Sequence, residues 1–212
     1  MRDCIFLLAD AEMKAAFEGF FSRHNFHLSL GTAPFEVDLR KDIIHDAQGK
    51  DPGIYTRAHE LLRPYARTHA HGVIVLDNAW DGSPGAENIR THISANMVRS
   101  GWREDRFAVI VINPELEAWI WQDNVHVEKA LGYTSPPSLR LWLRDEGLWP
   151  DGLEKPPDPK EAVLRTMRVF RKKSFSVVFK QICLQVSLRS CTDPEFERLC
   201  SALHQWFPYK TE

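Results

Sequence analysis

Residues 71–121 read HGVIVLDNAWDGSPGAENIRTHISANMVRSGWREDRFAVIVINPELEAWIW, and this stretch decides the fold. Two short apolar runs within it, Val73–Leu76 and Phe107–Ile112, are rich in β-branched residues and have the length of buried strands. The segment Glu87–Ser100 between them carries an apolar residue at every fourth position, which is the spacing of one helix face. Strand, helix and strand in succession form the unit of a parallel sheet, so the stretch predicts an α/β fold.

Acidic side chains follow both predicted strands. Asp77 and Asp81 come after the first strand, and Glu115 and Glu117 come after the second. Binding sites in open α/β sheets form just outside the carboxyl ends of the strands. Four carboxylates gathered there would repel one another unless a cation, usually Mg²⁺, or a set of basic groups lies among them. A second interpretation remains open, because acids also serve as helix caps and interact favourably with helix N-termini.

The amino-terminal segment repeats this order of elements. Cys4–Ala9 is a continuous apolar run typical of a central parallel strand, and Glu12–Arg23 has the spacing of an amphipathic helix. Asp10 lies between them, where it is either the N-cap of the helix or a fifth acid at the same sheet edge.

The next part of the chain has weaker signals. His27–Leu30 and Phe35–Leu39 are predicted as two further strands, the second because it alternates apolar and polar residues. Asp42–Gly53 is rich in turn formers and is predicted as a loop, and Ile54–Arg67 as a helix that Pro64 kinks or ends. Four polar residues of the loop could reach a ligand, although solvated loop residues are the simpler interpretation of each: His45, Asp46, Lys50 and Asp51.

Proline-rich segments begin after Leu131, so we expect an α/β domain over residues 1–130 and a helical carboxyl-terminal extension over 131–212, packed on it. The extension is predicted to contain helices at Ser138–Glu146, Pro159–Arg171, Ser174–Leu188 and Glu195–Trp206. Residues 160–173 of the extension hold the densest positive patch of the chain, which suits either a helix C-terminus or contact with a phosphate backbone. The residues of this predicted nucleic-acid-binding patch are Lys160, Arg165, Arg168, Lys172 and Lys173.

Composition narrows the class of protein. The 212 residues are 43% hydrophobic and 26% charged with a net charge of −2, which is typical of a globular protein and gives no general sign of a nucleic-acid binder. No apolar run has the length of a signal-peptide core or a membrane span, so we expect a cytoplasmic location and no membrane partner. The four cysteines lack CxxC spacing and are interpreted as reduced structural thiols, since a zinc site of Cys183, Cys191, Cys200 and His204 would match no metal-finger pattern.

The motifs of other phosphate-handling and hydrolytic enzymes do not occur. The sequence has neither G-x-x-x-x-G-K-[ST] nor G-x-G-x-x-G, and it has no G-x-S-x-G nucleophile motif.

Several longer segments resemble the TOPRIM-like proteins of bacterial anti-phage defence loci, including a group from methylation-associated systems. The segments are LLADAEMKAAFEGFF (7–21), VIVLDNAWDG (73–82), VINPELEAWIW (111–121), KPPDPKEAV (155–163), and CTDPEF (191–196) with WFP (206–208). The resemblance implies a TOPRIM-like, Rossmann-like, mostly parallel sheet flanked by helices. It also implies a glutamate after the first strand for acid–base chemistry and an Asp-x-Asp pair that holds Mg²⁺.

By position, Asp10 corresponds to that glutamate, Asp77 to the first aspartate, and Asp81 to the nearest candidate for the second. Asp10 is shorter than glutamate, and the spacing from Asp77 to Asp81 is two residues too long. Glu115 or Glu117 could complete the metal shell.

Two functions from different classes follow. In the first, the protein is a nuclease that uses Mg²⁺ or Mn²⁺, with Asp10, Asp77 and Asp81 as metal ligands and Asp10, Glu115 and Glu117 as catalytic residues. In the second, it is a catalytically degenerate TOPRIM-like protein that binds a partner protein from the same operon, with self-association also open. The tryptophans favour the second, because interfaces are enriched in them: Trp102, Trp119, Trp121, Trp142, Trp149 and Trp206.

Overall fold

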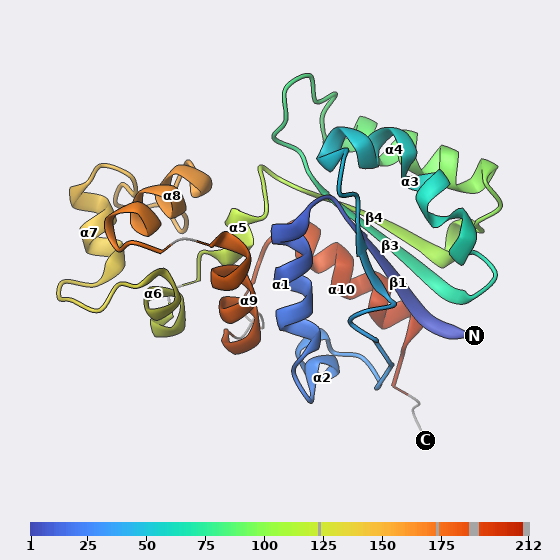
Figure 1. Cartoon of the computed structure of the whole chain (residues 1–212), viewed down its shortest axis with the longest axis horizontal. Helices are drawn as coiled ribbons and strands as arrows, with labels where there is room; N and C mark the ends of the chain where they lie inside the picture. Colours follow the sequence, from blue (N-terminus) through green and yellow to red (C-terminus); the bar gives the residue numbers. More distant parts are fainter. Residues whose placement is uncertain (123, 173, 187–190, 210–212) are drawn as a thin grey trace.

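The apolar runs form the strands of a parallel sheet at the centre of the protein, as a computed structural model of residues 1–122, 124–172, 174–186 and 191–209 shows (Figure 1). Within this part of the chain the sheet has four strands in the order β2-β1-β3-β4, and every neighbouring pair is parallel. Their bounds are β1 Arg2–Leu8, β2 Ile43–His45, β3 His69–Asp77 and β4 Phe107–Ile112. The predicted α/β class and mostly parallel sheet are therefore confirmed.

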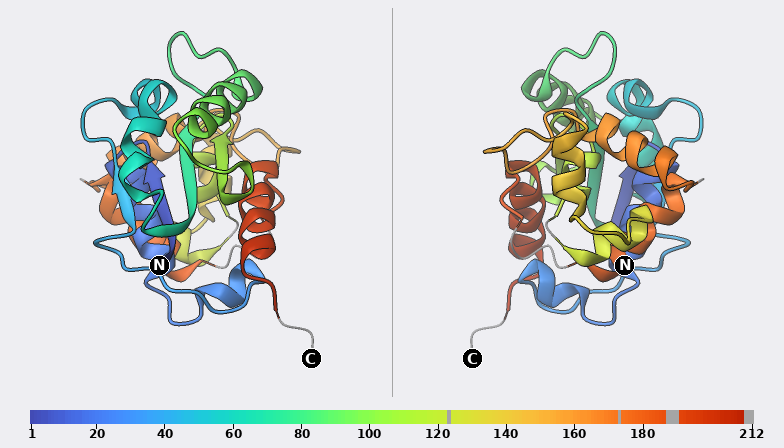
Figure 2. Two further views of the ribbon diagram at one scale, coloured as in Figure 1. Left: turned by 90° about the vertical axis from the view of Figure 1, so that its right-hand side faces the viewer. Right: turned by 90° about the vertical axis from the view of Figure 1, so that its left-hand side faces the viewer.

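Helices cover both faces of the sheet, which explains why its central strands are apolar throughout rather than alternating (Figures 1 and 2). Helices α3 (Lys50–Leu62) and α4 (Ala86–Arg99) lie on one face, against β3 and β4. Helices α1 (Ala11–Phe21) and α10 (Pro194–Trp206) lie on the other, and α9 (Phe175–Gln185) packs along α1. In β1, Ile5 and Phe6 have no exposed surface.

The remaining helices lie mostly beyond the carboxyl ends of the strands, at the left of Figure 1. They are α5 (Glu117–Ile120), α6 (Val125–Leu131), α7 (Leu139–Asp145) and α8 (Pro159–Val169), while α2 (Phe26–Leu30) follows α1. Two 3-10 turns, Arg63–Tyr65 and Glu104–Arg106, complete the elements of the described residues. None of the helices described has the length and apolar character needed to cross a membrane.

Three predictions for residues 26–53 are wrong. Residues 27–30 lie in α2, residues 35–39 form no strand, and β2 lies inside the segment that was predicted as a loop. The apolar pattern there comes from aromatic packing instead, since the rings of Phe26 and Phe35 lie 5.0 Å apart and both pack near Phe21. Helix α3 also begins at Lys50, four positions before its predicted start at Ile54.

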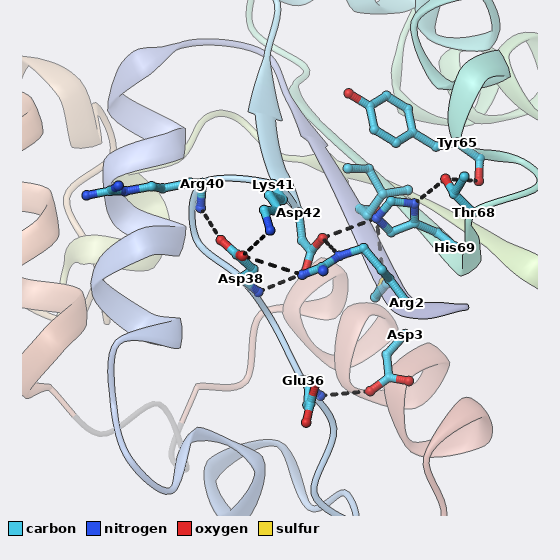
Figure 3. A network of polar contacts seen from close by, with 12 residues as sticks. Arg2, Asp3, Glu36, Asp38, Arg40, Lys41, Asp42, Tyr65, Thr68 and His69 are labelled. Atoms are coloured by element: carbon cyan, nitrogen blue, oxygen red, sulfur yellow. Dashed lines mark hydrogen bonds and ion pairs between the residues drawn. The ribbon is translucent and has the colours of Figure 1, made fainter.

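The amino-terminal ends of the strands are joined by a polar network around Asp42, shown in Figure 3. The carboxylate of Asp42 accepts hydrogen bonds from the guanidinium of Arg2, from the Asp38 backbone N–H at 2.7 Å, and from His69 Nε2 at 3.1 Å. Burial of Asp42 opposes its ionisation, but these donors outweigh burial and lower its pKa. Asp42 thus fixes the preceding loop to β1 and β3, at the end of the sheet opposite the predicted site.

Candidate functional site: an acidic cluster at the carboxyl ends of the strands

The strand order creates a switch point between β1 and β3. The chain leaves β1 for β2 on one side and later returns to form β3 on the other side. Connections that diverge in this way leave a crevice outside the carboxyl ends of the two strands, and ligands of open α/β sheets bind there. Only Ala9 separates Asp10 from the end of β1, and Asp77 is the last residue of β3. Two of the predicted acids therefore lie at this switch point.

Asp77 is the centre of the acidic group. Its Oδ1 atom is buried and has no hydrogen-bond partner among the described residues. Burial raises the pKa of Asp77 well above its ordinary value, and the charges of four further carboxylates raise it more: Asp51, Glu117, Asp10 and Glu115. We refer to Asp10, Asp51, Asp77, Glu115 and Glu117 as the Asp77 cluster. A buried, unpaired carboxylate oxygen surrounded by like charge is stable only when it is protonated or when a cation compensates it.

Asp51 reaches the cluster from the first turn of α3. Its Oδ1 atom accepts a hydrogen bond from the backbone N–H of Asp77 at 2.8 Å. Burial raises the pKa of Asp51, the hydrogen bond from Asp77 opposes this, and the charge of Asp10 adds to the increase. The sequence suggested Asp51 only as one of four loop residues. The signal that could have singled it out is its place in the first turn of a helix, which points the residue toward the sheet edge.

The other three loop residues make no contact with the Asp77 cluster that the structure records. Asp46 is paired with Arg57 at 2.6 Å, His45 ends β2, and Lys50 is exposed in the first turn of α3.

Glu115 and Glu117 enter from the connection between β4 and α5. They are 7% and 6% exposed, which is rare for glutamates without a compensating partner. Helix α5 begins at Glu117 rather than at Pro114, and the carbonyl of Pro114 accepts hydrogen bonds from Asn78 and Ala79 at 3.1 and 2.9 Å. These bonds hold the loop after β3 against the loop after β4. Burial, and then the charge of Glu115, raise the pKa of Glu117 to about 7.

Asp10 is both the N-cap of α1 and a further acid at this edge of the sheet. As the N-cap of α1, its Oδ1 atom accepts a hydrogen bond from the backbone N–H of Met13 at 2.8 Å. Its charge also acts on Asp51, Asp77 and Glu117. Asp81, in contrast, lies exposed in the loop after β3. The structure thus brings Asp51 to Asp77, where the sequence predicted Asp81.

The predicted positive patch is divided between different surroundings. Nζ of Lys160 lies 3.3 Å from Glu115 Oε2, so this residue belongs to the Asp77 cluster. Partial burial works against the Lys160 ammonium, but Glu117 and Glu115 outweigh it and raise its pKa. Arg165 pairs with Glu146 at 2.5 Å, while Arg168 and Lys172 are exposed. Lys173 lies outside the described residues.

Most of the tryptophans serve the core rather than a surface. Trp102, Trp119, Trp121 and Trp149 are each 7% exposed or less. The half-buried Trp206 stacks on His71 with ring centroids 4.4 Å apart. These four tryptophans are therefore not available to a partner protein.

The described side chains do not form a ready-made metal cage. No three of their His, Cys, Asp or Glu residues are already placed to hold one metal ion, either in the Asp77 cluster or around Cys183, Cys191, Cys200 and His204. Comparisons with models of protein families, with curated proteins and with solved structures found no match.

Proposed function

We propose that the Asp77 cluster binds Mg²⁺ or Mn²⁺ and that the protein is a TOPRIM-like nuclease of an anti-phage defence system. The observation that supports this most strongly is the buried, unpartnered Oδ1 atom of Asp77 among four further carboxyl groups. Hard divalent cations prefer carboxylate oxygens, and Mg²⁺ in particular keeps several waters while it is held by few protein ligands. Asp51 and Glu117, whose charges act on Asp77, are the candidates for a second protein ligand.

The position of the cluster suits phosphoryl transfer. A bound divalent ion would stabilise negative charge on phosphate oxygens. Asp77, Asp51 and Asp10 are the residues that would hold it, because they lie at the ends of β3, α3 and β1 that border the switch point. Glu117, whose pKa is about 7, is suited to accept or donate a proton near neutral pH.

Exposed cations along α8 suit nucleic acid as the substrate. Arg168 and Lys172 are exposed cations at the end of α8 and after it, and α8 begins at the Asp77 cluster with Lys160. A phosphate backbone that follows this helix would reach the acids at its other end. Contacts of this kind are electrostatic and independent of base sequence.

The proposal is tested by Mn²⁺ binding and by cleavage of single- and double-stranded DNA and RNA. Asp77→Asn should abolish both, whereas Asp81→Asn, an exposed residue of the same loop, should leave both unchanged. A wild-type protein that binds no Mn²⁺ at millimolar concentration would overturn the metal site. If Mn²⁺ binds but none of the four substrates is cleaved, the metal site stands and the nuclease assignment fails.

A degenerate, partner-binding protein is the second candidate, because no three ligands stand in position within the described residues and Lys160 already pairs with Glu115. Under this alternative, Asp77→Asn would raise the melting temperature without affecting binding to the product of the neighbouring gene. Size-exclusion chromatography of the two co-expressed proteins measures that binding.

A further inference from the structure

Lys160 brings a positive charge to the mouth of the Asp77 cluster from a distant part of the chain. Its Nζ lies 3.3 Å from Oε2 of Glu115 across 45 positions of sequence. The backbone beside it is fixed, because the indole Nε1 of Trp121 donates a hydrogen bond of 2.9 Å to the carbonyl of Pro159. Trp121 follows α5 directly, so the segment that carries Glu115 and Glu117 also holds the start of α8. The fold therefore places the base of the lysine side chain and leaves only its stem to move.

The two partners of this ion pair differ in exposure. The side chain of Lys160 is 55% exposed, whereas that of Glu115 is 10% exposed. The carboxylate is enclosed by protein, while the ammonium at the end of its four-carbon stem can turn into solvent. Because Glu115 stays buried, the ammonium would leave at small cost only when another cation takes its place beside the carboxylate.

A divalent ion and the ammonium would compete for the same negative charge. The charges of Glu117, Glu115 and Asp77 all act on Lys160, and the buried Oδ1 of Asp77 still lacks a partner. A second positive charge within several ångströms of a bound metal ion would be repelled by it. Lys160 thus compensates part of the cluster only while no metal is bound.

We propose that Lys160 is a resident counterion, which a divalent metal ion displaces from Glu115 when it enters the Asp77 cluster. The inference rests on the proposed function, because it requires the cluster to bind a metal. The metal ion then replaces the Lys160 ammonium beside the carboxylates, and the ammonium moves into solvent. The exchange links the state of the site to the surface of α8, where the exposed Arg168 lies.

Mn²⁺ titration of the full chain, followed by calorimetry, gives the first test. Lys160→Met keeps a stem of similar length without the charge, and it should bind Mn²⁺ about tenfold more tightly than the wild type. Arg168→Met removes a charge from the same helix two turns away and should bind Mn²⁺ as the wild type does. Lys160→Arg keeps the charge and should also stay near the wild-type affinity. Equal Mn²⁺ affinity of Lys160→Met and wild type would overturn the inference.

Labelling of lysine amines, read by mass spectrometry, tests the displacement directly. Acetylation of Lys160 by an amine-reactive ester should become several-fold faster when Mn²⁺ is added, while acetylation of the exposed Lys172 should not change. If Mn²⁺ binds but Lys160 reacts at an unchanged rate, the resident-counterion proposal is wrong and the metal site stands. If neither the wild type nor Lys160→Met binds Mn²⁺, the proposed function fails as well.

Discussion

The side chain of Asp51 accepts a hydrogen bond of 2.8 Å from the backbone N–H of Asp77, and so joins the first turn of α3 to the end of β3. The bond holds the Asp51 carboxylate next to the end of β3, where the Oδ1 atom of Asp77 is buried. The pKa of each is raised, by burial first and then by the charges of neighbouring acids. The contact that builds the cluster therefore also creates the charge repulsion that a cation would relieve.

Substitution of Asp51 should separate its two roles. Asp51→Ala leaves the Asp77 N–H without its acceptor and should destabilise the protein by about 1–3 kcal/mol. Asp51→Asn keeps an acceptor oxygen and removes the charge, so it should be close to wild type in stability but bind Mn²⁺ more weakly. Urea unfolding and Mn²⁺ titration of both variants measure these effects. Equal stability of the two variants would show that the hydrogen bond contributes nothing.

Without metal, the free energy of unfolding should depend on pH because of the ionisation of Glu117. Its pKa is raised from 4.5 to about 7 in the fold, so the folded protein holds a proton that the unfolded chain releases. The stabilising effect of this proton is complete below pH 4.5 and is lost as the pH rises through 7, by about 3 kcal/mol.

Glu117→Gln should remove that dependence, and saturating Mg²⁺ should reverse it in the wild type because the ion favours the carboxylate. Unfolding free energies from pH 5 to 8 provide the measurement. The difference between wild type and variant is the quantity to compare, since Asp51 and Asp77, whose pKa values are also raised, contribute a pH dependence in the same sense. Parallel pH profiles for the two proteins would contradict the raised pKa.

Glu195 should be important for the attachment of α10 to the sheet. Its carboxylate pairs with Arg90 of α4 at 3.0 Å and accepts the backbone N–H of Val111 on the edge strand β4 at 3.0 Å. Glu195→Ala would leave the Val111 N–H without its acceptor and the Arg90 guanidinium with only the Val109 carbonyl and Glu87 as partners, and should cost about 1–3 kcal/mol. Glu197→Ala, an exposed residue in the same helical turn, is the matched control and should change stability by less than about 0.5 kcal/mol. Thermal unfolding of the two variants gives the comparison.

The contact of α1 with α9 should not tolerate a side chain at Gly19. A Cβ atom there would lie 2.3 Å from the carbonyl oxygen of Lys180, and backbone cannot move aside as a flexible side chain can. Gly19→Ala should therefore destabilise the protein by at least about 1–3 kcal/mol, although alanine is the better helix former. Lys14→Ala on the same helix removes only the 3.9 Å ion pair with Glu18 and should be nearly neutral. The denaturation midpoints of the two variants and the wild type measure the difference.

Binding of nucleic acid, if the proposal holds, should be sensitive to salt in proportion to the phosphate contacts. Removal of Arg168 or Lys172 by alanine should each lower the slope of log affinity against log salt by about 1. Arg165→Ala should have a smaller effect, because that guanidinium is already paired with Glu146. Fluorescence anisotropy with a labelled oligonucleotide between 50 and 200 mM salt would measure the slopes. An unchanged slope for both variants would exclude α8 as the contact surface.

The sequence by itself determined the central part of the fold. Runs of β-branched residues at 73–76 and 107–112, with helical spacing between them, are local signals that depend on no distant contact. They correctly predicted β3, α4 and β4, and the same reasoning gave β1, α1 and the Asp10 cap. The predicted starts of α8 at Pro159 and of α10 at Glu195 are correct to within one residue, and in the structure Asp158 and Asp193 accept backbone N–H bonds there as N-caps. Local sequence signals predict an element correctly wherever the conformational preference of its residues agrees with the final fold.

Only the tertiary structure decided which charged residues meet. Asp51, predicted in a loop, reaches Asp77 because α3 begins four residues earlier than predicted and its first turn lies against the end of β3. Lys160, predicted to face a phosphate backbone, turns to Glu115 because the Pro159 carbonyl is held by Trp121. Asp81 remains in the exposed loop although the sequence favoured it. These outcomes depend on contacts between residues 26 to 45 positions apart, and spacing along the chain carries no information about them.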